Sequence, residues 1–296
     1  MRYTKLDPAK AKSIASEAYA GGVMTSISDN LVVGFNSVDV NPLNTALRTN
    51  NPYFYYIAAP FADQLRTTKD PRSKYMIATY ANPGTITVAP ADTTAAGQFG
   101  LPIGVGFSFG ASSPGYRGAS GAGFKLSQLN FSTYNAGGAP IFFATYAQTQ
   151  LLLADAAFRG WLPAGASTAA TYYASGIRAS MDELATFPSA AAIPAADFNS
   201  YINQTSVSLA TGNELQKINT QYWIESLNNG AEGFANWRRT GFPVLIPNTQ
   251  GSPAAGGFIR RFPYPQSEFS SNSANYQAAV ASMGGDDLNQ RVFWDK

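Results

Sequence analysis

The sequence contains neither cysteine nor histidine among its 296 residues. The absence of both excludes disulfides, thiolate catalysis and Cys/His zinc sites. The absence of histidine also removes the commonest general base and the usual activator of a serine nucleophile. Gly106-Phe107-Ser108-Phe109-Gly110 matches the G-x-S-x-G pattern of a hydrolase nucleophile elbow. Since no histidine can activate Ser108 and no lysine follows a serine by three positions, we interpret this match as a glycine-rich segment without catalytic function.

Charged residues are also scarce, at 13% of the sequence, with 20 basic and 18 acidic side chains. No basic cluster is longer than Arg-Arg, which argues against nucleic-acid binding. No window reaches the roughly 18 uninterrupted apolar residues of a membrane-spanning helix. The first residues show no apolar stretch of a signal peptide, so we expect any export signal to lie outside this sequence. The polar but rarely ionic composition favours an exported protein that handles neutral ligands.

The N-terminal part is predicted to start with one helix and continue as a long irregular region. Asp7 and Pro8 are helix-start residues, Ala9–Ala20 contains helix formers, and Gly21-Gly22 ends the run. Residues 27–140 are rich in Gly, Pro, Asn and Thr and show no strong helical periodicity. A stretch of this length favours functional elaboration over simple connection.

The next region, residues 141–229, shows helical periodicity. The apolar residues at 143, 147, 151, 154 and 158 have the spacing of one helix face, which predicts a helix from Ile141 to Gly160. The residues at 173, 177, 181 and 184 predict a second helix, and the short Gly/Pro connection makes the two a hairpin of the tetratricopeptide type. A further helix is expected from about Asn213 to Leu227.

The C-terminal segment, residues 230–296, is rich in proline and aromatic residues. Such a composition favours extended conformation over helix. We therefore expect a coil that straps the helical layer, with one late helix from Tyr276 to Met283.

Several motifs, in one order, resemble the SusD/RagB family, and in particular its SusD-like branch. The resemblance covers the chain from Arg2 onward. The motifs are Lys69-Asp70-Pro71-Arg72, Phe143-Ala144-Thr145-Tyr146-Ala147-Gln148, Ile218-Asn219-Thr220-Gln221-Tyr222-Trp223, Trp237-Arg238-Arg239-Thr240-Gly241-Phe242-Pro243, Ile259-Arg260-Arg261-Phe262-Pro263-Tyr264-Pro265-Gln266-Ser267-Glu268 and Phe293-Trp294-Asp295-Lys296. The family usually carries a glutamate where this chain has Gln148.

This resemblance implies a mainly α fold, in which tetratricopeptide-like helical hairpins are wrapped by long irregular loops and a Pro/aromatic-rich C-terminal coil. It implies a surface-exposed outer-membrane lipoprotein that binds a nutrient, most often a glycan, and works with a SusC-like TonB-dependent transporter. Family members are usually longer. We therefore expect residues 1–296 to be one SusD-like domain that lacks its N-terminal repeats, and the signal and lipid anchor to lie outside this chain. No cofactor and no metal are implied.

Among the motif residues, we expect structural functions. Arg238, Arg239, Arg260 and Arg261 could bind phosphate or carboxylate ligands. The alternative, which we favour, is pairing with Asp70, Glu225, Glu232 or Glu268 to hold the C-terminal segment. Trp223, Trp237 and Trp294 are predicted packing anchors, and Asp70 and Arg72 belong to the same structural set.

Two acidic pairs are candidates for chemistry. On an uninterrupted helix Glu225 and Glu232 would share a face about 10 Å apart, and a pair of carboxylates is what a glycosidase needs. Asn228-Asn229-Gly230 should break that helix. Asp286-Asp287 resembles half of a calcium loop, but the remaining ligands are missing. We favour solvated or arginine-paired carboxylates in both cases and expect no catalytic residue.

Aromatic residues in the irregular region are the better candidates for ligand binding. Flat rings cover the C–H faces of sugars while neighbouring amides and hydroxyls bond the sugar hydroxyls. In extended backbone Tyr53 and Tyr55 would project the same way, as would Phe107 and Phe109. The alternative for each ring is ordinary core packing. The predicted ligand-binding residues are Tyr53, Tyr55, Tyr56, Phe107, Phe109, Tyr116 and Arg117.

The leading hypothesis is therefore a non-catalytic protein that captures a neutral oligosaccharide and presents it to a transporter. Two alternatives stay open from the sequence. One is a carboxylate-based glycoside hydrolase, and the other is a tetratricopeptide-type scaffold whose only partners are proteins.

Overall fold

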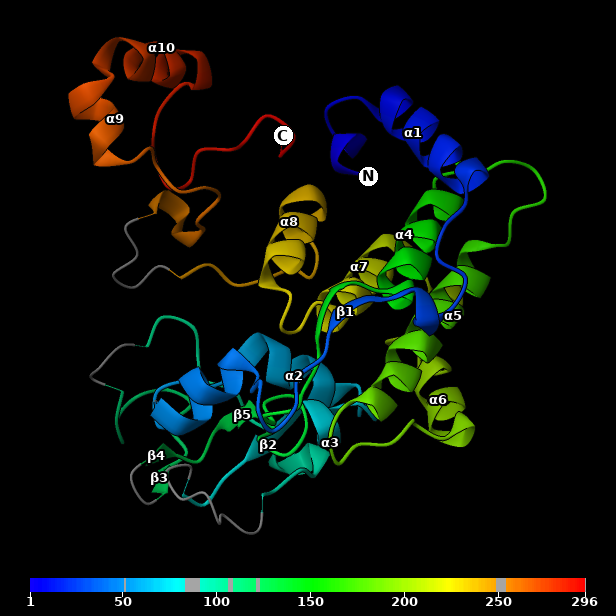
Figure 1. Cartoon of the computed structure of the whole chain (residues 1–296), viewed down its shortest axis with the longest axis vertical. Helices are drawn as coiled ribbons and strands as arrows, with labels where there is room; N and C mark the ends of the chain where they lie inside the picture. Colours follow the sequence, from blue (N-terminus) through cyan, green and yellow to red (C-terminus); the bar gives the residue numbers. More distant parts are fainter. Residues whose placement is uncertain (51, 83–90, 106–108, 121–122, 249–253, 296) are drawn as a thin grey trace.

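The computed structural model describes residues 1–50, 52–82, 91–105, 109–120, 123–248 and 254–295. Helices dominate the described chain, as the resemblance implied (Figure 1). The α-helices are, in chain order, α1 (Pro8–Gly21), α2 (Ala59–Thr67), α3 (Ser73–Met76), α4 (Tyr146–Phe158), α5 (Ala169–Glu183), α6 (Ala195–Ile202), α7 (Glu214–Glu225), α8 (Gly230–Thr240), α9 (Gln266–Ser271) and α10 (Ser273–Met283).

Short helical turns and small sheets complete the described secondary structure. The turns are η1 (Arg2–Thr4), η2 (Ile27–Asp29), η3 (Asn44–Asn50, a π-helix), η4 (Ala95–Gly97), η5 (Leu184–Thr186), η6 (Leu209–Thr211) and η7 (Ala255–Gly257). Each sheet is one antiparallel pair: β1 (Leu31–Val33) with β6 (Ile141–Ala144), β2 (Ile77–Thr79) with β5 (Ser127–Leu129), and β3 (Ala119–Ser120) with β4 (Gly123–Phe124). Within the described ranges, no helix has the length and apolar character needed to cross a membrane.

The N-terminal helix forms as its start signals predict. The Asp7 carboxylate accepts a hydrogen bond from the backbone N–H of Lys10, and Pro8 occupies the first helical position, where its missing N–H costs nothing. The helix ends at Gly21, and Gly22 takes a positive φ of 102°. The prediction for this segment is confirmed.

The α4–α5 hairpin is confirmed, but the predicted start of its first helix is wrong. Residues 141–144 form β6, which pairs with β1, so Phe143 lies on a strand and is 55% exposed instead of joining a helix face. The helix begins after Thr145, whose hydroxyl accepts from the Gln148 N–H while the Gln148 side chain accepts from the Thr145 N–H. This reciprocal capping box fixes the helix start.

The core lies where α4, α5 and α7 pack together. The side chains of Leu151, Ile177, Met181 and Ile218 are at most 1% exposed. Gly176 on α5 allows close approach to α4, because a β-carbon there would lie 2.8 Å from Leu151 Cγ. The hairpin therefore buries one face of each helix against α7 and its neighbours.

The region of residues 27–140 contains α2, α3 and β2–β5, which lie beside the helical layer (Figure 1), and it shares the core of that layer through Phe61, Leu65 and Met76. Tyr80 and Phe131 stack in it with ring centroids 4.4 Å apart. The C-terminal segment, with α9 and α10, lies at the opposite end of the molecule, near η1 and α8 (Figure 1). Phe293 contacts Tyr3, so the two ends of the chain meet there.

Candidate functional site

The predicted tyrosines lie between η3 and α2, with Tyr53 in a turn over residues 52–54 and Tyr55 and Tyr56 directly after it. The Gln128 side chain on β5 donates to the carbonyl oxygens of Pro52 (2.8 Å) and Tyr55 (2.9 Å) and so holds this turn in place. The Tyr53 hydroxyl donates to the Asn82 side chain over 3.2 Å. The expectation that Tyr53 and Tyr55 project the same way requires extended backbone. Because the turn interrupts the extended backbone here, the two side chains do not have that arrangement.

Tyr55 and Tyr56 instead border one hollow of about 200 Å³, together with Leu47 and Phe131. Tyr55 is 51% exposed. The Tyr56 hydroxyl accepts a hydrogen bond from the Phe124 N–H (2.9 Å), and burial raises the pKa of this phenol. The Tyr55 ring is thus open to solvent and the Tyr56 ring is held in place. Together they form an aromatic wall beside a small cavity.

The glycine-rich segment packs against the same region. Phe109 is only 8% exposed, and its ring meets Tyr116 and Phe124 edge-on at 5.6 and 5.2 Å. The Arg117 guanidinium lies 3.4 Å above the Phe99 ring. Phe109 therefore offers little ring surface to a ligand, whereas Arg117 stays exposed. Phe107 and Ser108 lie outside the described residues.

The motif residues Asp70 and Arg72 form a buried connection between helices. Arg72 is 1% exposed, and its guanidinium binds the Asp70 carboxylate (2.6 Å at the shortest), the Ser180 hydroxyl of α5 and the Gln221 side chain of α7. Gln221 in turn donates to the Tyr201 hydroxyl of α6. Burial opposes the charge, but the Asp70 carboxylate raises the pKa of Arg72 above its ordinary value, so the ion pair is maintained.

Arg239 makes a second buried connection, between α8 and the α4–α7 layer. Its guanidinium binds Asp155 on α4 (2.9 Å) and the side-chain oxygens of Asn219 and Asn236. Arg159 binds the other Asp155 oxygen. Burial alone would raise the pKa of Asp155, but the two arginines lower it below its usual value. Since every polar group is paired, this cluster supports the fold.

The remaining motif arginines hold the C-terminal segment. Arg260 pairs with the fully buried Asp295 (3.0 Å) and lies 4.3 Å over the Trp237 ring, and Arg238 lies 4.6 Å over Trp294. The Arg238 guanidinium also donates to the Arg260 carbonyl oxygen. These contacts join α8, the segment around residue 260 and the chain end. Trp223, by contrast, packs edge-on against Phe61 of α2 at 5.0 Å.

The predicted acidic partners of these arginines are wrong. Arg239 pairs with Asp155, Arg260 with Asp295, and Arg261 with Asp286 at 2.7 Å, instead of with Asp70, Glu225, Glu232 or Glu268. The Arg261 guanidinium therefore already pairs with Asp286, which is one residue of the candidate calcium loop.

Glu225 and Glu232, the candidate pair of carboxylates, lie on different helices. Glu225 is the last residue of α7, accepts from the Thr145 hydroxyl (2.8 Å) and shares a hydrogen bond with Glu183. Glu232 on α8 binds Arg2 (3.0 Å) and the Tyr222 hydroxyl. The hollow beside Glu183 and Glu225 measures only about 20 Å³, which is too small for a sugar. The two predicted carboxylates therefore face different partners.

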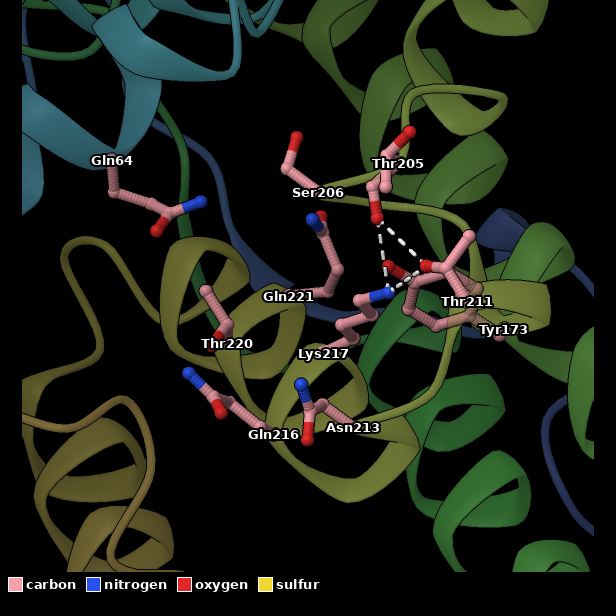
Figure 2. A pocket seen from close by; sticks show the side chains of 10 residues that line it. All are labelled: Gln64, Tyr173, Thr205, Ser206, Thr211, Asn213, Gln216, Lys217, Thr220 and Gln221. Carbon is pink, nitrogen blue, oxygen red and sulfur yellow. Dashed lines mark hydrogen bonds between the residues drawn. The ribbon is translucent and has the colours of Figure 1, made fainter.

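A polar pocket of about 320 Å³, which the sequence did not indicate, lies between α2, α7 and the loop before α7 (Figure 2). Gln216, Thr220 and Gln221 come from α7, Thr205 and Thr211 from the loop, and Gln64 from α2. The i, i+4 spacing of Gln216 and Thr220 is the only sequence signal for it, since the loop and α2 contributions depend on the tertiary fold.

An apolar groove of about 520 Å³ lies next to this pocket, and Gln64 borders both. Trp223, Ile103, Leu245 and Pro243 contribute to its wall. The irregular region, α7 and the segment after α8 thus meet at one surface.

Comparisons with known proteins identify what the chain resembles. A SusD-like family model, described as starch-binding and associating with the outer membrane, matches residues 1–265. No protein of curated function matches the chain. A solved chitin-binding protein is 31% identical with a TM-score of 0.78, and the match covers 100% of this chain and 62% of that one.

Two further solved structures agree with this. A SusD-like protein labelled Bacteroidetes AC2a is 26% identical (TM-score 0.79) over 100% of this chain and 67% of that one. A chitin-binding SusD homologue from Flavobacterium johnsoniae is 26% identical (TM-score 0.73) over 100% and 60%. This chain therefore spans about three fifths to two thirds of the length of the proteins that it matches.

Proposed function

The chain belongs to the SusD-like family, and from this premise we propose that it is a non-catalytic nutrient-binding protein of the outer-membrane surface. Its ligand is a neutral oligosaccharide, and it works with a SusC-like TonB-dependent transporter. The family description as starch-binding, and the chitin-binding proteins among its structural relatives, support the ligand class. The outer-membrane association in the same description supports the location and, with it, a transporter partner.

The hollow beside Tyr55 and Tyr56 is the observation that carries this proposal. An exposed ring next to a fixed ring offers apolar surface to the C–H face of a sugar at small cost in side-chain entropy. Gln128 fixes the backbone of the Tyr55 turn through two hydrogen bonds. A wall that is held in place before binding loses less entropy when the ligand arrives.

Binding without chemistry agrees with the placement of the acidic groups. A glycosidase needs two carboxyl groups that flank the scissile bond. Glu232 is paired with Arg2, and Glu225 borders a cavity of about 20 Å³. The described site around Tyr55 and Tyr56 has aromatic and amide groups on its wall instead.

Calorimetric titration of the full chain with maltohexaose and with chitohexaose tests the proposal. We expect binding of at least one of the two without release of new reducing ends. Tyr55→Ala should weaken that binding about tenfold, since a tenfold loss corresponds to about 1.4 kcal/mol, within the range for one aromatic contact. Phe54→Ala is the matched control, because this neighbouring ring is 71% exposed and is not on the wall of the hollow. Equal losses in both variants, or no binding by the wild type, would contradict the proposal.

A further inference from the structure

The polar pocket and the apolar groove form one continuous surface along two helices. On α7, Gln216, Thr220 and Trp223 follow at i, i+4 and i+7, so they line one side of the helix over about 10 Å. Gln216 and Thr220 border the pocket, and Trp223 borders the groove. Gln64 of α2 lies opposite and contacts both spaces (Figure 2). The surface thus changes from polar to apolar along its length.

The charged side chain of the polar half is committed to the neighbouring loop. Lys217 is the cationic side chain there, and its ammonium group has three N–H donors. It donates to the carbonyl oxygens of Thr205 (3.1 Å) and Ser208 (2.7 Å) and to the Thr211 hydroxyl. Figure 2 shows the Lys217 amine directed at this loop. Since all three donors are used, Lys217 fixes the loop and has no N–H left to donate to a ligand.

Uncommitted amides surround the remaining space. Among the described residues, no hydrogen bond joins the side chains of Gln64, Asn213 or Gln216 to another residue, and all three border the pocket, where Asn213 and Gln216 are exposed. Each carboxamide presents a donor and an acceptor side by side. Paired hydroxyl groups, which both donate and accept, are the natural complement to such a set.

The groove supplies apolar surface for the C–H face of a sugar. The Trp223 ring is partly buried and is held edge-on by Phe61 at 5.0 Å. Proline side chains on either side, Pro60 and Pro243, add rigid apolar surface. Asp63 at the rim is paired with Arg66 over 2.5 Å. A ligand with hydroxyls on one part and a C–H face on another would satisfy both halves.

From this geometry we infer that the surface between α2 and α7 is a second oligosaccharide-binding site, separate from the Tyr55–Tyr56 hollow. The inference takes its ligand class from the proposed function but rests on different residues. Two sites on one molecule would let a long glycan bind at two points, which increases the overall affinity beyond that of either site.

Titration of the full chain with maltohexaose and chitohexaose, followed by calorimetry and by tryptophan fluorescence, tests this. We expect two binding events per chain for the sugar that binds. The double variant Gln64→Ala/Gln216→Ala should weaken one event about tenfold, since two hydrogen bonds to neutral groups are lost. Trp223→Phe should remove the fluorescence change of that event. Gln277→Ala, on the exposed side of α10, is the control and should bind as the wild type does.

The variants separate this inference from the proposed function. Wild-type binding by the double variant, with the fluorescence change retained, would overturn the second site. Complete loss of binding in Tyr55→Ala would also overturn it, while the proposed function would stand. Loss in the double variant but not in Tyr55→Ala would support the α2–α7 site and contradict the assignment of the Tyr55–Tyr56 hollow. No binding of either sugar by the wild type would contradict both.

Discussion

The buried carboxyl group of Glu183 couples folding stability to pH. Burial first, and then the neighbouring Glu225, raise the pKa of Glu183 to about 10 from an ordinary value of 4.5. The Glu183 carboxyl also accepts from the Asn30 side chain over 3.1 Å. Between these two pKa values the folded state keeps a proton that the unfolded chain has released. The contribution of Glu183 is therefore most favourable below pH 4.5 and declines as pH rises towards 10.

Glu183→Gln should remove this pH dependence, because the amide is neutral at every pH and has nearly the same shape. We expect the variant to equal or trail the wild type slightly at pH 4.5, and to exceed its free energy of unfolding by about 1–3 kcal/mol at pH 8. Urea unfolding at pH 4.5, 6.5 and 8 measures the difference. Glu17→Gln, on the exposed face of α1, should leave the profile unchanged. Parallel pH profiles for wild type and Glu183→Gln would show that Glu183 does not titrate in this way.

The kind of interaction that a residue makes could be predicted from the sequence better than the partner with which it makes it. The motif arginines were expected to make structural ion pairs, but their acidic partners were misassigned. Arg239 finds Asp155 across 84 positions of the chain. Nothing in the local sequence distinguishes Asp155 from other acidic residues, since only the packing of α8 on α4 brings the two charges together. Arg2–Glu232 connects even more distant positions.

At the scale of elements, start signals predicted helices well where local contacts decide the boundary. Asp7 and Pro8 define α1, as expected. The apolar pattern that begins at Phe143 places the start of the predicted helix too early. Residues 141–144 form β6 instead, because they gain ladder hydrogen bonds from β1, which lies more than a hundred residues earlier in the chain. Thr145 and Gln148 carry the correct signal in a capping box. The glutamine that replaces the usual family glutamate still accepts the capping hydrogen bond.

The contact between α4 and α5 allows a prediction in which two effects oppose each other. Alanine in place of Gly176 would favour the helix by about 1 kcal/mol. Its β-carbon, however, would lie 2.8 Å from Leu151 Cγ and 3.2 Å from the Ala147 carbonyl oxygen. Overpacking in a closely packed core costs about 1–3 kcal/mol. We expect Gly176→Ala to lower the free energy of unfolding by about 1–2 kcal/mol, measured by urea denaturation.

Gly230→Ala provides the matched comparison. Gly230 is the first residue of α8, its φ is not positive, and nothing lies within 4 Å of the added β-carbon. Only the backbone effect remains there, so this variant should be neutral or slightly more stable than wild type. If Gly176→Ala were as stable as Gly230→Ala, the α4–α5 contact would be looser than the structure indicates.

The aromatic site shows what element-level reasoning misses. Composition and the flat shape of their rings predict Tyr53, Tyr55 and Tyr56, at and directly after the 52–54 turn, as ligand-binding residues. Their arrangement depends on Gln128, which reaches the Pro52 carbonyl across 76 residues. The polar pocket beside α7 likewise needs Gln64 of α2, and its ligand-facing groups are common glutamines and threonines. Such sites become visible only when the chain is folded.

At the scale of the whole molecule, the mainly α architecture agrees with the expectation. The subdivision into residues 27–140, 141–229 and 230–296 stays a prediction, and so does the absence of earlier repeats. The chain covers 62% of the length of the chitin-binding relative. The functional proposals therefore concern the part of the fold that this chain contains.

An exposed apolar ribbon on β1 and β6 leads to a prediction about association. Leu31 is 61%, Val32 43%, Val33 45% and Phe143 55% exposed, and these residues lie on paired strands. Association that covered these exposed apolar side chains would gain about 25 cal/mol for each Å² buried. We expect the 296-residue chain to self-associate through this ribbon at micromolar concentrations, which sedimentation velocity over a concentration series measures. The double variant Leu31→Thr/Phe143→Thr places β-branched threonines, which suit strands, at both positions and should shift the chain towards monomer without lowering its melting temperature. Val244→Thr, at a side chain that is 73% exposed elsewhere, should leave the association unchanged. A wild type that sediments as a monomer at every concentration would show that the ribbon tolerates solvent, and equal association of all three proteins would assign the contact to another surface.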